Sequence, residues 1–356
     1  HTVLLESATP FLRTMADQLQ YGNDTRVTGY DPLIAPSLLM HELPVSDKGK
    51  ETIARGRFDV SRVVTGKDDR LLVVVGPCSI HDPEQAKEYA RRLHEASQSR
   101  WKDGLVVVMR AYFEKPRTTV GWKGLINDPN LDGSYQINKG LRLARGFLLE
   151  VAKMGLPAGT EFLDTISPQY TADLISWGAI GARTTESQVH RELTSGMSMP
   201  IGFKNGTDGS VSIAVDAIKS ASSSHAFLSV TKQGISAIVE TAGNDSCHII
   251  LRGSNTGPNY AREHVEGAAA ALEKNSLSPR IMVDCSHGNS EKKHQNQIKV
   301  VDSIAEQLAQ GDSNAWNVFG VMLESHLVEG KQSMPPTGPA DLTYGQSITD
   351  GTYEPD

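Results

Sequence analysis

The chain has 356 residues, of which 38% are hydrophobic and 22% charged, and its formal net charge is −7 at pH 7. This length suits one large α/β domain with additions or two ordinary domains, and the composition excludes a disordered chain. The acidic balance argues against a nucleic-acid partner, which usually requires a surplus of basic residues.

The cysteines and the apolar runs indicate where in the cell the protein acts. Three cysteines, Cys78, Cys247 and Cys285, are too few for a disulfide framework and indicate a reducing compartment, so we expect a cytoplasmic protein. The longest apolar runs, residues 71–75 and 105–109, are too short to span a bilayer, so no membrane contact is expected. The chain begins at a histidine, which leaves a removed targeting peptide open.

Short apolar, β-branched runs recur along the chain, and helical patterns follow them. This alternation predicts βα units around a parallel sheet. Eight such strands are the number that closes a (β/α)8 (TIM) barrel. The runs are residues 71–79, 105–111, 158–163, 179–184, 200–205, 248–253, 281–287 and 318–325.

Local signals mark the ends of several helices. Asp82 followed by Pro83 and Glu84 is typical of a helix start, with an N-cap, a proline at the first helical position and an acid in the first turn. A glycine after the last helical residue is typical of a helix end. We predict helices over residues 84–96, 186–195 and 291–310, the last two ending at Gly196 and Gly311.

Two segments do not fit the eightfold pattern. Residues 1–65 precede the first strand and are interpreted as an N-terminal extension to the catalytic barrel of residues 66–356. Residues 226–241 predict a β-hairpin around Gln233 and Gly234, inserted between the fifth and sixth barrel strands. Such additions commonly serve assembly or regulation, and a simple lid on the barrel bottom is the alternative.

Every predicted strand ends in a side chain that can take part in chemistry. In a (β/α)8 barrel these ends meet on one face, where active sites lie. Each residue alone could be a solvated loop charge or a core residue, but the eight together predict one polar site. They are Cys78, Arg110, Glu161, Arg183, Lys204, Arg252, His287 and Glu324.

Four of these eight residues are cations, and Lys115 and Arg117 in the loop after the second strand add two more. Guanidinium groups match phosphate and carboxylate groups with two parallel hydrogen bonds. Six converging cations in an acidic protein therefore predict ligands with several negative charges, including more than one phosphate.

A second group has the chemistry of metal ligands. Cys78, His287 and Glu324, with an acid from the C-terminal tail, form a mixed sulfur, nitrogen and oxygen set. Such a set suits a divalent Mn, Fe, Co or Zn ion better than Mg or Ca. The ligands are scattered along the chain, so for His287 a hydrogen-bonded residue at the start of a loop remains the alternative.

Long ordered motifs resemble type I 3-deoxy-D-arabino-heptulosonate 7-phosphate (DAHP) synthases. The resemblance runs from about Gly29 to Asp350. Its motifs are GPCSIHD at residues 76–82, MRAYFEKPRTT at 109–119, GAIGARTTESQ at 178–188, GFKNGTDG at 202–209, SHGNS at 286–290 and SITD at 347–350.

The resemblance implies the condensation of phosphoenolpyruvate with erythrose 4-phosphate to DAHP and phosphate, the first step of the shikimate pathway. It implies one divalent metal ion held by Cys78, His287, Glu324 and Asp350. The implied substrate residues are Arg110, Lys115, Glu161, Arg183, Lys204 and Arg252 for phosphoenolpyruvate, and Lys115, Pro116, Arg117 and Thr118 for erythrose 4-phosphate. Among these, Glu161 would position a water, and Lys115 would act as a catalytic general acid.

Family members are commonly feedback-inhibited by one aromatic amino acid, in a pocket often built across a subunit boundary. The resemblance therefore implies a homodimer or homotetramer. The segment FLSVTK, residues 227–232, resembles the phenylalanine-sensitive form. Pocket candidates are Pro168, Gln169, Ser198 and Ser229, with ordinary loop and hairpin structure as the alternative.

The sequence departs from the family at its end. Only residues 351–356 follow Asp350, too few for an eighth helix, so we expect one side of the barrel to be bare and the order of Asp350 to be open. Rival interpretations are a 3-deoxy-octulosonate phosphate synthase, a Schiff-base aldolase using Lys204, and a non-catalytic amino-acid-binding paralogue. The retained cations and candidate ligands favour the enzyme.

Overall fold

The computed structural model describes residues 23–310, 317–335 and 337–354. The chain divides into a unit formed by His1–Leu33 and a second unit formed by Ile34–Asp356. In the first unit, residues 23–33 form turns and irregular chain without a helix or strand. Everything below concerns the second unit. Among the described residues, no helix is long and apolar enough to cross a membrane.

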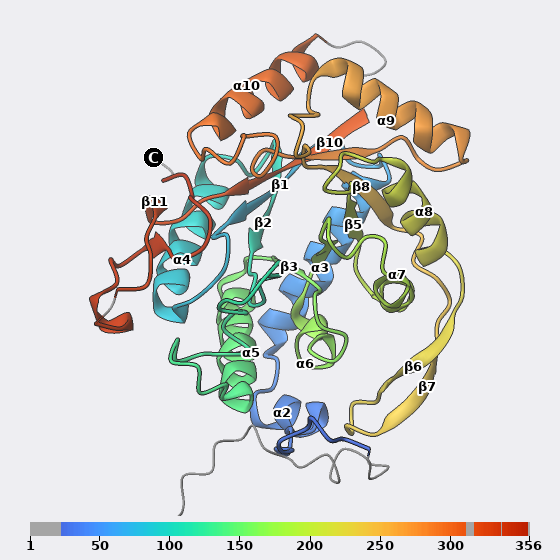
Figure 1. The fold of residues 1–356 in the computed structure, drawn as a ribbon. Helices are drawn as coiled ribbons and strands as arrows, with labels where there is room; N and C mark the ends of the chain where they lie inside the picture. Colours follow the sequence, from blue (N-terminus) through green and yellow to red (C-terminus); the bar gives the residue numbers. More distant parts are fainter. Residues whose placement is uncertain (1–22, 311–316, 336, 355–356) are drawn as a thin grey trace, which may run out of the picture. The chain divides into compact units, whose positions relative to one another are not determined.

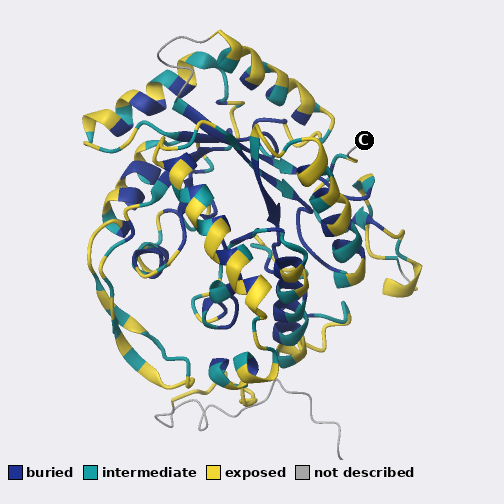
Figure 2. Ribbon diagram, turned by 180° about the vertical axis from the view of Figure 1, so that it is seen from behind, coloured by how far each residue is buried: buried dark blue, intermediate teal, exposed yellow. Residues whose placement is uncertain are grey.

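Eight parallel strands close into a barrel, which confirms the predicted fold (Figure 1). Each strand pairs with its neighbour in chain order, and β10 returns to pair with β1. The strands are β1 (Leu71–Gly76), β2 (Leu105–Arg110), β3 (Ala158–Glu161), β4 (Trp177–Ile180), β5 (Ile201–Lys204), β8 (Cys247–Leu251), β9 (Ile281–Asp284) and β10 (Val318–Glu324). Figure 2 shows most of these strands as buried, as expected when helices cover the outside and side chains fill the inside.

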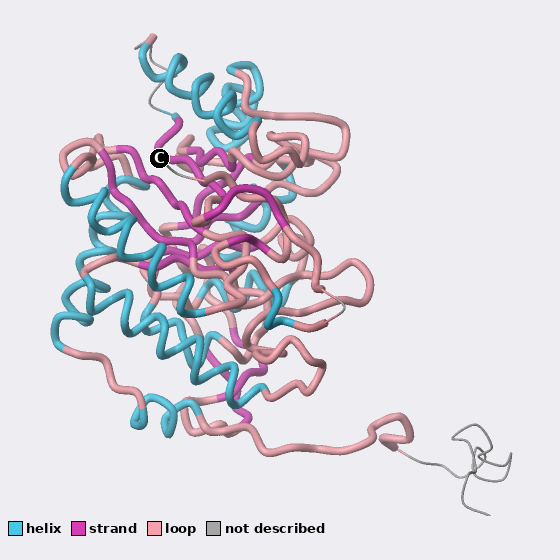
Figure 3. Tube along the Cα trace, turned by 90° about the vertical axis from the view of Figure 1, so that its left-hand side faces the viewer, coloured by secondary structure: helices cyan, strands magenta, loops and turns pink. Residues whose placement is uncertain are grey.

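Helices connect the strands. They are α4 (Pro83–Ser99), α5 (Ile137–Met154), α6 (Pro168–Thr171), α7 (Gln188–Ser195), α8 (Ser212–Ala221), α9 (Arg262–Lys274) and α10 (Asn296–Ala309). The predicted N-cap of α4 is confirmed, because the Asp82 carboxylate accepts a hydrogen bond from the Glu84 N–H at 2.8 Å. Figure 3 shows many of the long connecting loops on the right of the strands in that view.

Two predicted helix starts were wrong. The helix predicted from residue 291 begins at Asn296, because Glu291 and Lys292 have φ angles of 54° and 61°. These left-handed conformations cannot continue a right-handed helix. The helix predicted from residue 186 begins at Gln188, after a turn, and its predicted end at Gly196 is confirmed. Gly311 lies outside the described residues.

In the described part of the chain, two helices precede the barrel strands: α2 (Pro36–Glu42) and α3 (Asp47–Val64). Val60, Val63 and Val64 of α3 join one buried cluster with the inward side chains of the barrel. The Arg57 guanidinium donates to the carbonyl of Ile175, just before β4, and the Val63 carbonyl accepts from Arg280, just before β9. The helix α3 therefore covers the end of the barrel where the strands begin, as Figure 1 also shows.

The predicted hairpin is confirmed between the fifth and sixth barrel strands. It consists of β6 (Ala226–Val230) and β7 (Ser236–Glu240), paired antiparallel. Gly234 turns the chain at φ 77°, a left-handed conformation that suits glycine. Leu228 and Ile238 lie opposite each other and are 86% and 73% exposed, so an apolar pair faces outward on a two-stranded ribbon.

In the described residues, the C-terminal segment follows β10 without a further α-helix and holds only the short 3-10 helix η3 (Pro339–Asp341). The strands β11 (Val328–Lys331) and β12 (Gln346–Ser347) pair with each other, and Tyr353 N–H donates to the Glu324 carbonyl at 3.0 Å. The β1 side chains alternate between buried and half-buried, as expected for a strand whose outer face is incompletely covered. Asp350 is nevertheless held in place, because the residues on both sides of it are anchored.

Candidate active site

One cavity of about 570 Å³ collects the chemically capable residues at the carboxyl ends of the barrel strands. All eight residues predicted from the strand ends line it. The loop after β2 contributes Lys115, Pro116, Arg117 and Thr118, and the C-terminal segment contributes Asp350. The sequence-predicted substrate and metal residues therefore share a single space.

Half of the eight predicted strand-end residues lie in loops rather than at strand ends. The predicted strands that carried them ran too far at their carboxyl ends: residues 71–79, 179–184, 248–253 and 281–287. After β4 the chain turns at once, because Thr184 and Thr185 N–H both donate to the Gly181 carbonyl at 3.0 Å. The residues in loops are Cys78, Arg183, Arg252 and His287. They still enter the cavity, because these loops leave the same end of the barrel.

Three predicted metal ligands form a compact group. One atom from each of Cys78, Glu324 and Asp350 lies within 4.8 Å of the others, a group that could hold a metal ion. The Lys115 ammonium lies 2.9 Å from Cys78 Sγ and 2.7 Å from Asp350 Oδ2. A cation thus already sits among these electron-rich atoms, which shows that the site favours positive charge.

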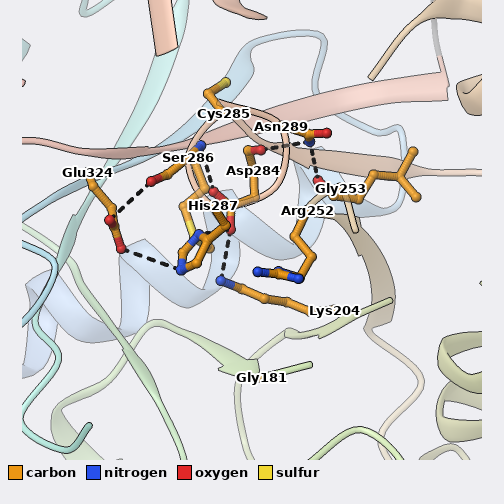
Figure 4. Close-up of polar contacts among 12 residues, drawn as sticks. Gly181, Lys204, Arg252, Gly253, Asp284, Cys285, Ser286, His287, Asn289 and Glu324 are labelled. Atoms are coloured by element: carbon orange, nitrogen blue, oxygen red, sulfur yellow. Dashed lines mark hydrogen bonds and ion pairs between the residues drawn. The ribbon is translucent and has the colours of Figure 1, made fainter. Parts of the chain in front are cut away.

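The fourth predicted ligand, His287, borders this group. Its Nε2 lies 3.7 Å from Glu324 Oε1, while its Nδ1 lies 2.8 Å from Asp284 Oδ2 (Figure 4). The Nδ1 contact is close, although its direction is not that of a well-aligned hydrogen bond. A ring with one nitrogen facing a carboxylate and the other facing the ligand group has the arrangement of a metal-binding histidine.

The protonation of the group also fits a divalent cation. Burial, reinforced by the charge of Glu324, raises the pKa of the Cys78 thiol to about 11. Burial alone would lower the pKa of Lys115, but its interactions with the acidic groups around it, first Cys78 and then Asp350, raise it. A bound divalent ion would lower the thiol pKa and replace the ammonium as the compensating charge.

Arg110 is the most deeply buried cation of the cavity, with 1% of its surface exposed. Its guanidinium pairs with Glu324 Oε1 at 3.0 Å and lies 4.0 Å from the centre of the Tyr112 ring. It also donates to the carbonyls of Pro77 and Cys78, each at 3.3 Å. Arg110 therefore fixes both the loop that carries Cys78 and the carboxylate of Glu324.

Sequence reasoning missed Asp284, which forms an ion pair with Lys204 at 2.8 Å and faces His287. It also missed Ser286, whose hydroxyl donates to Glu324 Oε2 at 3.0 Å. An acid three residues before His287 was a signal for Asp284, but the overlong strand prediction placed it inside the barrel wall. Burial alone would raise the pKa of Asp284, yet His287 and Lys204 hold it well below its usual range.

Glu114 is a third residue that sequence reasoning missed. It lies in the substrate loop beside Lys115, is 9% exposed, and accepts a hydrogen bond from the Ser167 hydroxyl at 2.8 Å. Burial raises the pKa of Glu114 to about 7, with Ser167 opposing the shift and Asp164 adding to it. A largely desolvated carboxyl therefore ties the substrate loop to the start of α6.

The raised pKa of Glu114 predicts a pH-dependent loss of stability. Between about pH 4.5 and 7 the folded protein holds a proton here that the unfolded chain has released, so stability falls as the pH rises through this window. This change in stability amounts to about 3 kcal/mol at most. We expect Glu114→Gln to gain stability relative to the wild type on going from about pH 5 to about pH 8.

Urea unfolding of both proteins at the two pH values measures this change. Glu273→Gln, at an exposed position of α9, is the control and is expected to show no such trend. A constant stability difference between Glu114→Gln and the wild type at both pH values would contradict the raised pKa.

The regulatory candidates lie in two parts of the described structure. Gln169 Nε2 donates to the Val230 carbonyl at 2.9 Å, and Lys232 Nζ donates to the Gln169 carbonyl at 2.6 Å. Pro168 and Gln169 of α6 therefore lie beside the turn end of the hairpin that carries Ser229. In contrast, Ser198 lines a separate cavity of about 180 Å³.

Comparison with known proteins gives the family. Residues 42–354 match the DAHP synthetase I family. The chain belongs to the DAHP synthetase I family. Members of this family are metal-dependent DAHP synthases, so the predicted resemblance and the predicted class of enzyme are confirmed. The octulosonate phosphate synthase and the Schiff-base aldolase are correspondingly disfavoured.

Individual relatives agree with this assignment. The chain is 55% identical over 93% of its length to the Phe-sensitive phospho-2-dehydro-3-deoxyheptonate aldolase of Escherichia coli, and covers 93% of that protein. It is 54% identical over 92% of its length to a tyrosine-inhibited enzyme of Candida albicans, and covers 89% of it. These near-equal identities do not select an inhibitor.

A solved structure of a phospho-2-dehydro-3-deoxyheptonate aldolase from Francisella tularensis has the same fold. It superimposes with a TM-score of 0.88 at 52% identity, covering 92% of this chain and 94% of that one. The fold of this chain therefore matches that of the Francisella tularensis protein over most of the length of both chains.

Proposed function

We propose that this chain catalyses the metal-dependent condensation of phosphoenolpyruvate with erythrose 4-phosphate to give DAHP and phosphate. The observation that carries the proposal is that one cavity is lined by all six predicted cations and by the group of Cys78, Glu324 and Asp350. Cations suited to two phosphorylated substrates lie beside atoms suited to a metal, as this reaction requires.

Phosphoenolpyruvate would bind at the inner end of the cavity. Arg183, Lys204 and Arg252 come from the loops and strands on one side of the barrel, and Arg110 and Lys115 come from the other. Their charges would neutralise the phosphate and carboxylate of this substrate. Glu161, at the end of β3, would position the water that later adds to its C2 atom.

Erythrose 4-phosphate would bind toward the mouth of the cavity. The loop residues Pro116, Arg117 and Thr118 line the cavity next to Lys115. The Arg117 side chain folds over Gly121, where an added Cβ would lie only 2.6 Å from its Nε. This close approach would hold the guanidinium in place to grip the phosphate of the aldose.

The metal would be held by Cys78, Glu324 and Asp350, with His287 turning its Nε2 toward the same point. Their sulfur, nitrogen and oxygen donors suit Mn, Fe, Co or Zn. When bound, the ion supplies Lewis-acid polarisation of the aldehyde oxygen.

The protein residues would then position the reacting atoms. The cations hold two mutually repelling phosphorylated substrates together, so that C3 of phosphoenolpyruvate meets the aldehyde carbon. The Lys115 ammonium is placed to donate a proton to the oxygen that was the aldehyde. Water adds at C2, and the phosphate leaves by cleavage of the C2–O bond, with its charge retained by the arginines.

We also propose an inhibitor site, an assembly and a location for this enzyme. An aromatic amino acid, phenylalanine in preference to tyrosine, would bind near Pro168, Gln169, Ser198 and Ser229 and act as a feedback inhibitor. The exposed Leu228–Ile238 pair of the hairpin and the extension of residues 1–65 would serve assembly into a homodimer or homotetramer. The enzyme would act in the cytoplasm.

The first test follows the loss of the enol absorbance of phosphoenolpyruvate in the presence of erythrose 4-phosphate. We expect activity that is abolished by EDTA and restored by Mn²⁺. Folded protein that binds phosphoenolpyruvate but shows no turnover with any divalent ion would support the non-catalytic paralogue. Activity that survives EDTA and is trapped by borohydride would support a Schiff base at Lys204.

Two substitutions of assay components separate the remaining alternatives. Arabinose 5-phosphate in place of erythrose 4-phosphate tests for an octulosonate phosphate synthase, and we expect it to react poorly. Phenylalanine and tyrosine added in parallel test the inhibitor, and we expect phenylalanine to inhibit at the lower concentration.

A further inference from the structure

Asp284 occupies a position between the two ends of the active-site cavity. It is the last residue of β9 and is fully buried. One neighbour, Lys204, belongs to the proposed phosphoenolpyruvate end, and the other, His287, belongs to the proposed metal end. Figure 4 shows both side chains reaching toward its carboxylate.

The two neighbours share one oxygen atom. Lys204 Nζ and His287 Nδ1 each lie 2.8 Å from Asp284 Oδ2. The other oxygen, Oδ1, accepts a hydrogen bond from the Ser286 N–H at 3.0 Å. Both carboxylate oxygens are therefore engaged, and any change in the charge near Lys204 acts on the same atom that faces His287.

We infer that Asp284 is a positioning residue that couples phosphoenolpyruvate binding to metal binding. The inference rests on the proposed function. The anion of phosphoenolpyruvate would draw on the Lys204 ammonium, so that less of its charge neutralises Oδ2. Oδ2 then attracts the His287 Nδ1–H more strongly, which orients the ring and strengthens Nε2 as a ligand.

The sign of the coupling follows. Phosphoenolpyruvate raises the affinity for the metal, and the metal raises the affinity for phosphoenolpyruvate by the same factor, because the two effects are thermodynamically linked. A direct attraction between the anion and the metal ion contributes as well. A substitution at Asp284 removes only the coupling that this residue transmits and leaves the direct attraction in place.

Asp284→Asn removes the shared acceptor while keeping the shape of the side chain. An amide has one acceptor oxygen, which can face either the Lys204 and His287 pair or the Ser286 N–H. In either orientation its NH₂ group faces another donor. The variant therefore cannot reproduce the contacts of the carboxylate.

The experiment measures Mn²⁺ binding to metal-depleted protein by electron paramagnetic resonance, without and with saturating phosphoenolpyruvate. In the wild type we expect phosphoenolpyruvate to raise the Mn²⁺ affinity about tenfold or more. The coupling ratio is the Mn²⁺ affinity with phosphoenolpyruvate divided by the Mn²⁺ affinity without it. In Asp284→Asn we expect this ratio to fall at least about fivefold. The Mn²⁺ affinity without phosphoenolpyruvate should also fall, by about 10- to 100-fold.

Two control variants make the result specific. Arg252→Gln removes a cation from the same end of the cavity and leaves the Lys204–Asp284 pair in place, so it should weaken phosphoenolpyruvate binding but keep the ratio at saturation. Asp173→Asn removes a carboxylate paired with the buried Arg145 outside the cavity, and controls for lost stability. If Asp284→Asn does not fold, Lys204→Gln tests the same link and should also lose the ratio.

The outcomes separate the inference from the proposed function. An unchanged ratio in Asp284→Asn, or an equal loss in Arg252→Gln, would overturn the coupling through Asp284. A wild type that binds Mn²⁺ and phosphoenolpyruvate independently would overturn it too. A wild type that binds neither would instead contradict the proposed function, and the inference with it.

Discussion

Replacing Cys78 by alanine is expected to lower metal affinity by roughly 100-fold or more and to abolish measurable condensation. The thiol is the only sulfur donor of the group that the described structure brings together with Glu324 and Asp350. Without it, the two carboxylates and His287 form a harder and less complete set of ligands. Lys115 also loses the contact at 2.9 Å that holds its ammonium beside the reacting groups.

Three variants make this result interpretable. Cys78→Ser keeps nearly the same volume and offers a neutral oxygen, so it should recover the fold fully and metal binding only in part. Cys247→Ala, at the start of β8, removes a thiol that does not line the cavity and is expected to leave activity unchanged. Mn²⁺ affinity, turnover and the melting temperature are measured for each. Wild-type Mn²⁺ affinity in Cys78→Ala would rule Cys78 out as a ligand.

The barrel could be predicted from sequence because its strands are local features. Apolar, β-branched runs such as residues 71–76 are buried on at least one face, and their apolar composition predicts this burial directly. Eight runs in alternation with helices then leave few topologies. The same reasoning located the hairpin, whose turn depends on Gly234.

The exact course of the loops could not be predicted in this way. The strand β9 ends at Asp284, and His287 three residues later has a φ angle of 55°, although these residues read as a continued strand in the sequence. Such a conformation is imposed by contacts that come from distant parts of the chain, including Glu324 and Arg252. The role of Asp284 depended on the same contacts, so it became visible only in three dimensions.

The sequence contained a signal for the buried face of α3 that the prediction did not use. Val60, Val63 and Val64 recur with helical spacing, which is a signal for one buried face. The signal does not say what the face packs against. The structure shows that the barrel interior is that partner, which makes part of the N-terminal extension a component of the core.

Arg110→Met is expected to destabilise the protein by about 3 kcal/mol or more and to abolish activity. The change leaves the Glu324 carboxylate, which is 1% exposed, without the guanidinium that lies 3.0 Å away. Removing one partner of a buried ion pair costs more than the pair itself contributes, because the remaining charge stays desolvated. Ser286 and His287 compensate Glu324 only in part.

Arg145→Met is the matched control for stability. Arg145 is also 1% exposed and pairs with Asp173 at 2.8 Å, but it lies outside the cavity. Both variants should lower the free energy of unfolding measured in urea, whereas only Arg110→Met should lose metal and phosphoenolpyruvate binding under conditions where it remains folded. Loss of both ligands in Arg145→Met as well would show that the effect comes from instability alone.

The double variant Arg110→Met with Glu324→Gln separates the two contributions of Arg110. Removing both charges together removes the desolvation penalty, so stability should return toward that of the wild type. Activity should not return, because the metal group has lost a carboxylate and the cavity has lost a cation. Recovered stability without recovered activity would mean that the Arg110–Glu324 ion pair serves the active site and does not stabilise the fold. An apolar pair at these two positions would then give an equally stable or more stable protein without activity.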